Sequence, residues 1–135
     1  IGVADVKREG TDVTIVARSL MVPVALKAAE QLQEQGVSFE VIDPRTIRPL
    51  DIDTIIESVK KTNRVVLAEE SHPICSVNAE ISHEIMERAC DYLDAPVKRI
   101  SGADVPMPYA KSLEELAVPD AEKIIAAVRE VAYLD

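Results

Sequence analysis

Three short apolar runs, each followed by a stretch with the apolar spacing of a helix, constrain the fold of this chain most strongly. The runs cover residues 13–17, 37–43 and 64–69, and the helical spacing covers 21–35, 52–61 and 77–93. A strand that is apolar at nearly every position is typical of a sheet covered on both faces. Strands that alternate with helices indicate a parallel sheet. We therefore expect an α/β fold, a three-layer sandwich whose mostly parallel sheet has helices on both faces.

The remaining segments fit the same single domain, residues 1–135. A short strand over residues 3–8 and a strand over 97–100 are predicted, and the Pro-rich stretch 102–111 favours neither helix nor strand. A helical turn over 113–116 and a last helix beginning after Pro119 and Asp120 complete the chain. The chain begins at Ile1 and its first residues already have strand character, so we expect a fragment of a longer polypeptide.

Residues 39–51 turn a strand into a helix without using glycine. Pro44 and Pro49 restrict the backbone of this elbow, and Asp51 can accept hydrogen bonds from the first turn of the next helix. Arg45 and Arg48 could bind an anion. Charged side chains in such a turn more often hold a neighbouring carboxylate, within the chain or across an interface, and we predict that role.

Composition argues against nucleic acid and membrane partners. The chain has 24 acidic and 15 basic residues, a formal charge of −9, so it would repel a phosphate backbone. One Phe, three Tyr and no Trp leave little to stack on bases. No apolar run approaches the roughly 18 residues of a membrane span. The two cysteines suggest a reducing compartment, with Cys90 buried on an apolar helix face and Cys75 in a loop.

No complete catalytic, cofactor-binding or metal-binding set can be assembled from the sequence. The four glycines form neither a dinucleotide-binding nor a P-loop motif. Glu69, Glu70 and His72 follow a strand and could be imagined as an acid–base set. Adjacent side chains on an extended chain point to opposite sides, however, so we expect hydrogen bonding or capping instead. His83 lies among glutamates on a helix, where an ion pair is expected.

Three motifs carry a resemblance to a known family. They are residues 40–51 (EVIDPRTIRPLD), residues 79–81 (AEI) and residues 102–111 (GADVPMPYAK). Together they resemble the transketolase C-terminal domain, and the last motif most closely resembles the beta subunits of pyruvate dehydrogenase. The resemblance covers the whole chain. Residues 71–78 depart from it, because the relatives are richer in glycine there.

The resemblance implies the function of a larger enzyme. Members of this family are alpha2beta2 enzymes that decarboxylate pyruvate oxidatively and transfer the acetyl group to the lipoyl group of a dihydrolipoamide acetyltransferase core. Their thiamine diphosphate and magnesium lie between the alpha subunit and the other domain of beta, so this fragment is expected to be inactive alone. The implied location is the bacterial cytoplasm, or the mitochondrial matrix in a eukaryote.

For this domain the resemblance implies assembly and docking. The expected partners are the alpha subunit, a second beta subunit and the subunit-binding domain of the acetyltransferase. The docking aspartate of the family corresponds to Asp94, and the other docking element to the chain end with Leu134 and Asp135. Asp94 could equally be a turn residue before Pro96, and the ending departs from relatives that finish on an apolar residue.

Two alternatives remain open on the residues alone. The chain could be the same domain of another 2-oxo acid dehydrogenase or of a transketolase-like enzyme. It could also be a free-standing α/β domain that binds a small ligand. The sign of the latter would be a deep pocket at the strand ends around Arg18, Arg45 and His72.

Overall fold

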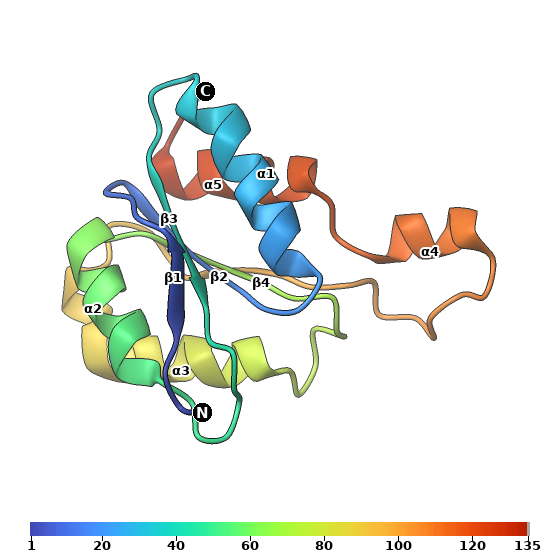
Figure 1. Cartoon of the computed structure of the whole chain (residues 1–135), viewed down its shortest axis with the longest axis horizontal. Coiled ribbons are helices and arrows are strands. Elements are labelled where there is room, and N and C mark those ends of the chain that lie inside the picture. Colours follow the sequence, from blue (N-terminus) through green and yellow to red (C-terminus); the bar gives the residue numbers. More distant parts are fainter. Residues whose placement is uncertain (135) are drawn as a thin grey trace.

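A computed structural model describes residues 1–134 as a five-stranded sheet between two layers of helices (Figure 1). The strands lie in the order β1-β3-β2-β4-β5, and all neighbours are parallel except β1, which pairs antiparallel with β3. The predicted α/β class and mostly parallel sheet are confirmed. The strands are β1 (Asp5–Arg8), β2 (Val13–Ala17), β3 (Phe39–Asp43), β4 (Val65–Ala68) and β5 (Lys98–Ile100).

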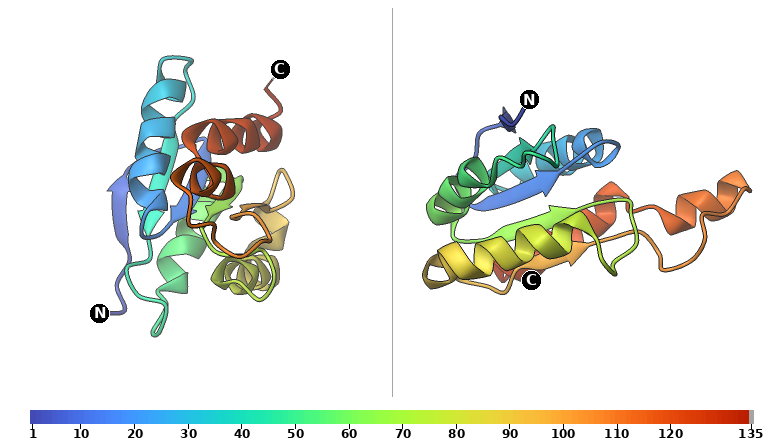
Figure 2. Two further views of the ribbon diagram at one scale, coloured as in Figure 1. Left: turned by 90° about the vertical axis from the view of Figure 1, so that its right-hand side faces the viewer. Right: turned by 90° about the horizontal axis from the view of Figure 1, so that it is seen from below.

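The helices cover both faces of the sheet, as Figure 2 shows from two further directions. On one face lie α1 (Met21–Gln33) and α5 (Ala121–Ala132), and on the other lie α2 (Ile52–Thr62) and α3 (Val77–Ala89). A 3-10 turn, η1 (Cys90–Tyr92), follows α3, and the short α4 (Lys111–Ala117) stands apart from the sheet (Figure 1). Among residues 1–134, no helix is both long and apolar enough to cross a membrane.

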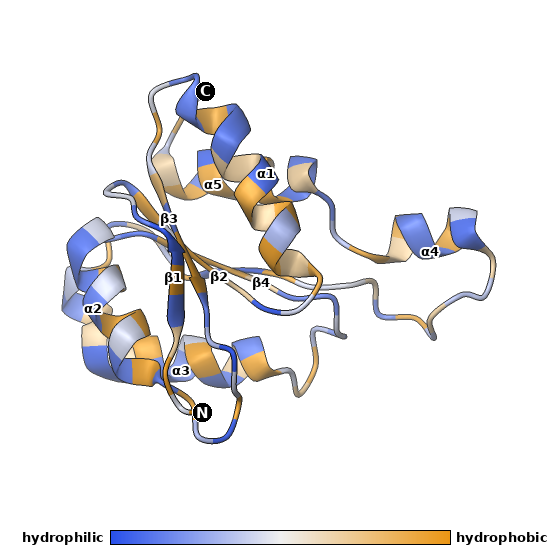
Figure 3. Ribbon diagram, viewed as in Figure 1, coloured by the Kyte–Doolittle hydropathy of each residue, from blue (hydrophilic) through white to orange (hydrophobic). Residues whose placement is uncertain are grey.

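The alternation of side chains along the central strands divides the interior into two cores. In β2, Val13, Ile15 and Ala17 pack toward α1 and α5, whereas Val16 packs toward α2 and α3. All residues of β2 and of β4 are buried. The apolar residues of the strands and of the inner helix faces accordingly meet across both layers (Figure 3). Both faces need apolar side chains, which explains why the sequence shows a continuous run instead of alternation.

Hydrogen bonds pair several of the polar side chains buried between the sheet and α2 and α3, although the amide nitrogen of the buried Asn78 has no partner among the described residues. The Thr14 hydroxyl oxygen lies 2.6 Å from the Ser58 hydroxyl and 2.7 Å from that of Thr62, which ties β2 to α2. The buried Glu40 carboxylate accepts hydrogen bonds from Lys61 and from the Gly10 amide, 3.3 Å away. Burial would raise the pKa of Glu40, but these hydrogen bonds outweigh it and hold the pKa below the ordinary value.

The elbow after β3 anchors two segments at once. Asp51 accepts hydrogen bonds from the Thr54 amide at 3.2 Å and from the Ala4 amide at 2.9 Å. The predicted cap of α2 is therefore confirmed, and the same carboxylate fastens the chain before β1. The amide of Ala4, followed by Thr54, lowers the pKa of Asp51. Nearby, the Gly2 amide donates to the Thr46 hydroxyl over 3.0 Å.

One expectation from the sequence is wrong, and another is not met within the chain. Cys90 is exposed, because α3 ends at Ala89 and the tighter η1 turn that follows rotates Cys90 out of the apolar face. Within residues 1–134, neither Arg45 nor Arg48 forms an ion pair, and both side chains are exposed. Their pairing with a carboxylate across an interface stays a prediction.

We predict that Gly10→Ala destabilises the fold far more than Gly36→Ala. A Cβ at residue 10 would lie 2.0 Å from the carbonyl carbon of Phe39, so β3 would have to move. The cost should reach about 3 kcal/mol in the free energy of unfolding. At residue 36 (φ +82°) nothing lies within 4 Å, and only backbone strain of about 1 kcal/mol is expected. Urea unfolding measures the loss of stability in each variant. Equal losses would contradict the close approach of residue 10 to Phe39.

Candidate docking surface and strand-end cluster

The carboxyl ends of three parallel strands bring a charged cluster together. Arg18 follows β2, Glu69 follows β4 and Ser101 follows β5. The fully buried carboxylate of Glu69 pairs with Arg18 and accepts hydrogen bonds from the hydroxyls of Ser71 at 2.9 Å and Ser101 at 3.2 Å. The predicted hydrogen-bonding role is thus confirmed for Glu69, whose partners tie β2, β4 and β5 together beyond the sheet ladder.

A hollow of about 420 Å³ lies beside this cluster at the ends of β2 and β3. Arg18 and Arg45 line it together, but His72 does not: its Nδ1 lies 3.7 Å from the Asp104 carboxylate. The charge of Arg18 is already matched by Glu69, and Asp43 also lines the hollow next to Arg45. The structure therefore unites only two of the three residues expected of a ligand pocket, with little net positive charge.

Glu69, the buried carboxylate at the strand ends, is not free to hold the magnesium ion of a diphosphate cofactor. Such a group takes carboxylate or carbonyl oxygens that are free to bind the metal. Glu69 is committed to Arg18 and two hydroxyls. Among residues 1–134, no group of three or more His, Cys, Asp or Glu side chains is arranged to hold a metal ion.

The turn that carries Asp94 is held from two sides. Asn63 ends α2 in a left-handed conformation (φ +62°), and its carbonyl accepts the Asp94 amide at 2.8 Å. The Asn63 side chain donates to the Tyr92 carbonyl, also at 2.8 Å. From the other side, the Tyr133 hydroxyl donates to the Asp94 carbonyl at 3.2 Å. The backbone of this turn is therefore fixed, which leaves the Asp94 side chain free to face outward.

The Asp94 carboxylate is exposed, with 58% of its side chain accessible, and lies 3.5 Å from the Arg64 guanidinium. Tyr133 reaches the Asp94 backbone carbonyl because α5 ends at Tyr133 in a left-handed turn, with the Leu134 amide donating to the Arg129 carbonyl at 3.0 Å. Leu134 is 44% exposed. The structure thus brings Asp94 into contact with the residue before Leu134, while Asp135 lies outside the described residues.

An apolar groove of about 510 Å³ adjoins Asp94 between α3, η1 and the start of β5. Met86, which is 47% exposed, and the exposed Cys90 lie along it with Leu93, Pro96 and Val97. A carboxylate beside an apolar groove suits a partner that offers a cation next to an apolar side chain. We call Asp94, Arg64, Tyr133, Leu134 and this groove the Asp94 surface.

Reasoning from the sequence named Asp94 and the chain end from Tyr133, but it missed Asn63 and Arg64. Asn63 carries a recognisable signal, because asparagine after a lysine-rich helix end often adopts the left-handed stop. Arg64 carries none, and the contacts of Asp94 with Arg64 and Tyr133 join positions about 30 and 39 residues apart in the chain. His83 lies 3.5 Å from Glu87 on α3, which confirms the expected ion pair.

Comparison with known proteins points to one family. The family model described as "Transketolase, C-terminal domain" matches residues 2–124. The chain is 56% identical to pyruvate dehydrogenase E1 component subunit beta-1, mitochondrial, of Arabidopsis thaliana, over 98% of this chain and 37% of that protein. It is 50% identical to pyruvate dehydrogenase E1 component subunit beta of Rhizobium meliloti (strain 1021), over 98% of this chain and 29% of that protein. The chain therefore spans about a third of the length of these curated relatives.

Solved structures agree on the fold. A structure titled "Split gene transketolase, inactive beta4 tetramer" superposes with a TM-score of 0.84 at 32% identity, covering 98% of this chain and 42% of that one. A 2-oxoglutarate:ferredoxin oxidoreductase from Magnetococcus marinus superposes with a TM-score of 0.64 at 14% identity, over 96% of this chain and 19% of that one. The second likeness concerns the fold alone.

We predict that Glu69→Gln destabilises the domain by roughly 2–3 kcal/mol, because it leaves the Arg18 charge without its partner. The loss should be smaller than for a fully buried pair, since the Arg18 side chain is 24% exposed. The matched control is Glu57→Gln, which removes an exposed partner of Lys60 and should change stability little. Urea unfolding measures the stability of both variants. If Glu69→Gln is as stable as the unsubstituted chain, the Arg18–Glu69 pair does not stabilise the domain.

Proposed function

The chain belongs to the family of transketolase C-terminal domains, and from that membership we propose that it is the C-terminal domain of a pyruvate dehydrogenase beta subunit. Its role there is assembly and the docking of the acetyltransferase core. One observation carries the docking proposal: the fold joins Asp94 to the chain end, 39 residues away in sequence, through the Tyr133 hydrogen bond.

The chemistry of the parent enzyme lies outside this chain in our proposal. The intact enzyme decarboxylates pyruvate oxidatively and passes acetyl to a lipoyl group, and thiamine diphosphate with its magnesium supplies the electron sink for that decarboxylation. The donor set at the strand ends supports this division, because Glu69 is committed to Arg18, Ser71 and Ser101. The isolated domain is accordingly inactive.

Docking requires a partner of complementary charge. The chain carries a formal charge of −9, so a basic subunit-binding domain would be attracted over a distance, which speeds encounter and orients the approach. At contact, a cation of the partner meets the Asp94 carboxylate beside Arg64, and an apolar side chain enters the adjoining groove. The fixed turn supports this, because a carboxylate held in place loses less entropy on binding.

The other partners are the alpha subunit and a second beta subunit. One solved structure is titled as an inactive beta4 tetramer. This title supports the idea that beta-type chains can associate with one another without forming an active enzyme. The location follows the parent enzyme: the cytoplasm of a bacterium, or the mitochondrion of a eukaryote, as the name of the Arabidopsis relative states for that protein.

A second candidate within the family is the same domain of another 2-oxo acid dehydrogenase or of a transketolase-like enzyme. Substrate assays on the intact complex distinguish these, since the substrate is bound elsewhere. The free-standing ligand-binding domain has only the hollow lined by Arg18 and Arg45 in its favour. The pairing of Arg18 with Glu69 weakens it.

We predict that Asp94→Ala weakens binding of the acetyltransferase subunit-binding domain by about 1–3 kcal/mol, because its charged partner would be left unpaired in the interface. Isothermal titration calorimetry measures the affinity. The matched control is Asp104→Ala, whose side chain is 62% exposed against 58% for Asp94 and which also has one basic side chain nearby, His72 at 3.7 Å. The control should bind as the unsubstituted chain does. Equal affinities for both variants would remove Asp94 from the docking site.

A further inference from the structure

The Asp94 carboxylate already has a cation of its own chain beside it. Nη2 of Arg64 lies 3.5 Å from Oδ2 of Asp94. A basic partner that docks at the Asp94 surface has to bring its own cation to this same carboxylate. The partner's cation and Arg64 therefore compete for one negative charge, and the two positive charges also repel each other there.

The backbone keeps Arg64 and Asp94 next to each other. The Asn63 carbonyl, directly before Arg64, accepts a hydrogen bond from the Asp94 amide at 2.8 Å. The Arg64 carbonyl accepts hydrogen bonds from the Thr14 amide at 2.8 Å and from the Thr62 hydroxyl at 3.1 Å. None of these hydrogen bonds uses the arginine side chain. The backbone therefore stays in place when the Arg64 side chain is substituted or turns away from Asp94.

The ion pair between Arg64 and Asp94 is weak. Its 3.5 Å separation exceeds the about 2.7–2.9 Å of a charge-assisted hydrogen bond. The Asp94 side chain is 58% exposed and the Arg64 side chain 29% exposed, so water screens the attraction. An exposed pair of this kind changes an equilibrium constant by at most about fivefold. A competing cation can therefore replace Arg64 at a small cost in free energy.

A buried nitrogen of Arg64 lowers that cost further. Nε of Arg64 is buried and has no hydrogen-bond partner among residues 1–134. A buried donor without an acceptor is unfavourable, because it has given up its hydrogen bond to water. When a partner's cation displaces the guanidinium from Asp94, the side chain can turn outward and Nε regains water. The free energy regained at Nε offsets part of the cost of opening the pair.

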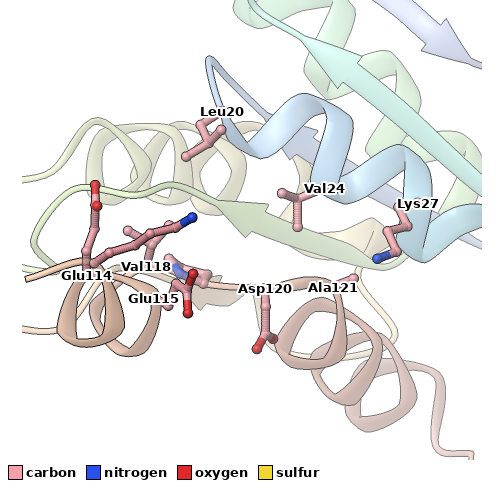
Figure 4. Close-up of a pocket in the computed structure, with 10 residues that line it drawn as sticks. Leu20, Val24, Lys27, Glu114, Glu115, Val118, Asp120 and Ala121 are labelled. Atoms are coloured by element: carbon pink, nitrogen blue, oxygen red, sulfur yellow. The ribbon is translucent and has the colours of Figure 1, made fainter.

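Another apolar groove with carboxylates at its edge lacks such a counter-ion. It has a volume of about 470 Å³ and lies between α1 and the junction of α4 and α5 (Figure 4). Its charged lining consists of Lys27, Lys111, Glu114, Glu115 and Asp120. Within residues 1–134, no ion pair joins these lysines to these carboxylates. A cation already in contact with the carboxylate is therefore a feature of the Asp94 surface and not of every acidic groove.

We propose that Arg64 is an internal competitor of the docking partner and sets the affinity of the Asp94 surface for a basic domain. This role rests on the docking function proposed above. The partner's cation takes the place of the Arg64 guanidinium at Asp94, and the Arg64 side chain turns toward water. Docking thus requires the opening of one ion pair, so its affinity is lower than the Asp94 carboxylate alone would give.

Calorimetric titration of the chain with the subunit-binding domain of a dihydrolipoamide acetyltransferase tests this role. Arg64→Met removes the charge and keeps an unbranched apolar stem. It should tighten binding about two- to fivefold, because Asp94 then has no internal partner. The neutral and polar Arg64→Gln should give the same gain. Arg64→Lys keeps the charge and should bind as the unsubstituted chain does.

The matched control is Arg8→Met. Arg8 is half-buried like Arg64, and its substitution changes the net charge by the same amount. It lies on β1, at the opposite edge of the sheet from β5 and the turn that carries Asp94. Arg8→Met should therefore bind as the unsubstituted chain does. Circular dichroism should show that all of these variants remain folded.

The same titrations in an Asp94→Ala background separate this role from docking itself. If Arg64 acts through Asp94, Arg64→Met has no effect on affinity once Asp94 is replaced. An unchanged or weaker affinity of Arg64→Met, or an equal gain in both backgrounds, would overturn the role of Arg64, while a weaker Asp94→Ala still supports docking. If Asp94→Ala binds as tightly as the unsubstituted chain, or if the subunit-binding domain does not bind, docking at Asp94 fails and the role of Arg64 fails with it.

Discussion

Burial of the central strands on both faces is the constraint on which the rest of the structure depends. All residues of β2 and β4 are inaccessible, so neither strand can lie at a surface, and each face of the sheet needs its own layer of helices. Because helices connect the parallel strands, the carboxyl ends of these strands lie at the same edge of the sheet. For that reason Arg18, Glu69 and Ser101 meet, although they come from three distant parts of the sequence.

This constraint also decides which parts of the molecule face solvent. The apolar side chains of four helices pack against the two faces of the sheet. The turns at the ends of these helices are left to face solvent. One such turn, between η1 and β5, is fixed by Asn63 and Tyr133 and presents Asp94. At the other end of the molecule the segment that carries α4 projects from the body (Figure 1).

The sequence predicts the elements whose signal is local. The apolar run 13–17 is β2 with the same bounds, and Asp51 caps α2 as predicted. Each depends on neighbours within one turn or one strand. Cys90 was placed on the wrong side because a change from α-helix to 3-10 turn rotates the chain without an obvious mark in the sequence.

The contacts of the site could be predicted only in part, because they join residues far apart in the chain. A family resemblance identifies Asp94 and the chain end, yet it gives neither Arg64 nor the hydrogen bond from Tyr133, since nothing local in the sequence marks these contacts. The pairing of Arg18 with Glu69 likewise depends on the strand order, in which β2 and β4 are adjacent. The same order explains why Arg45, at the end of β3, lies beside Arg18 without sharing its carboxylate.

The central claim is that this domain binds a basic partner through the Asp94 surface and not through the strand ends. The most direct measurement is a titration of the isotopically labelled chain with a basic subunit-binding domain, followed by amide chemical shifts. The account predicts shifts at Asn63, Arg64, residues 93–95, Val97, Tyr133 and Leu134, with the amides around Arg18 and Arg45 at the strand-end hollow unchanged. Shifts confined to that hollow, with the Asp94 surface unaffected, would contradict it.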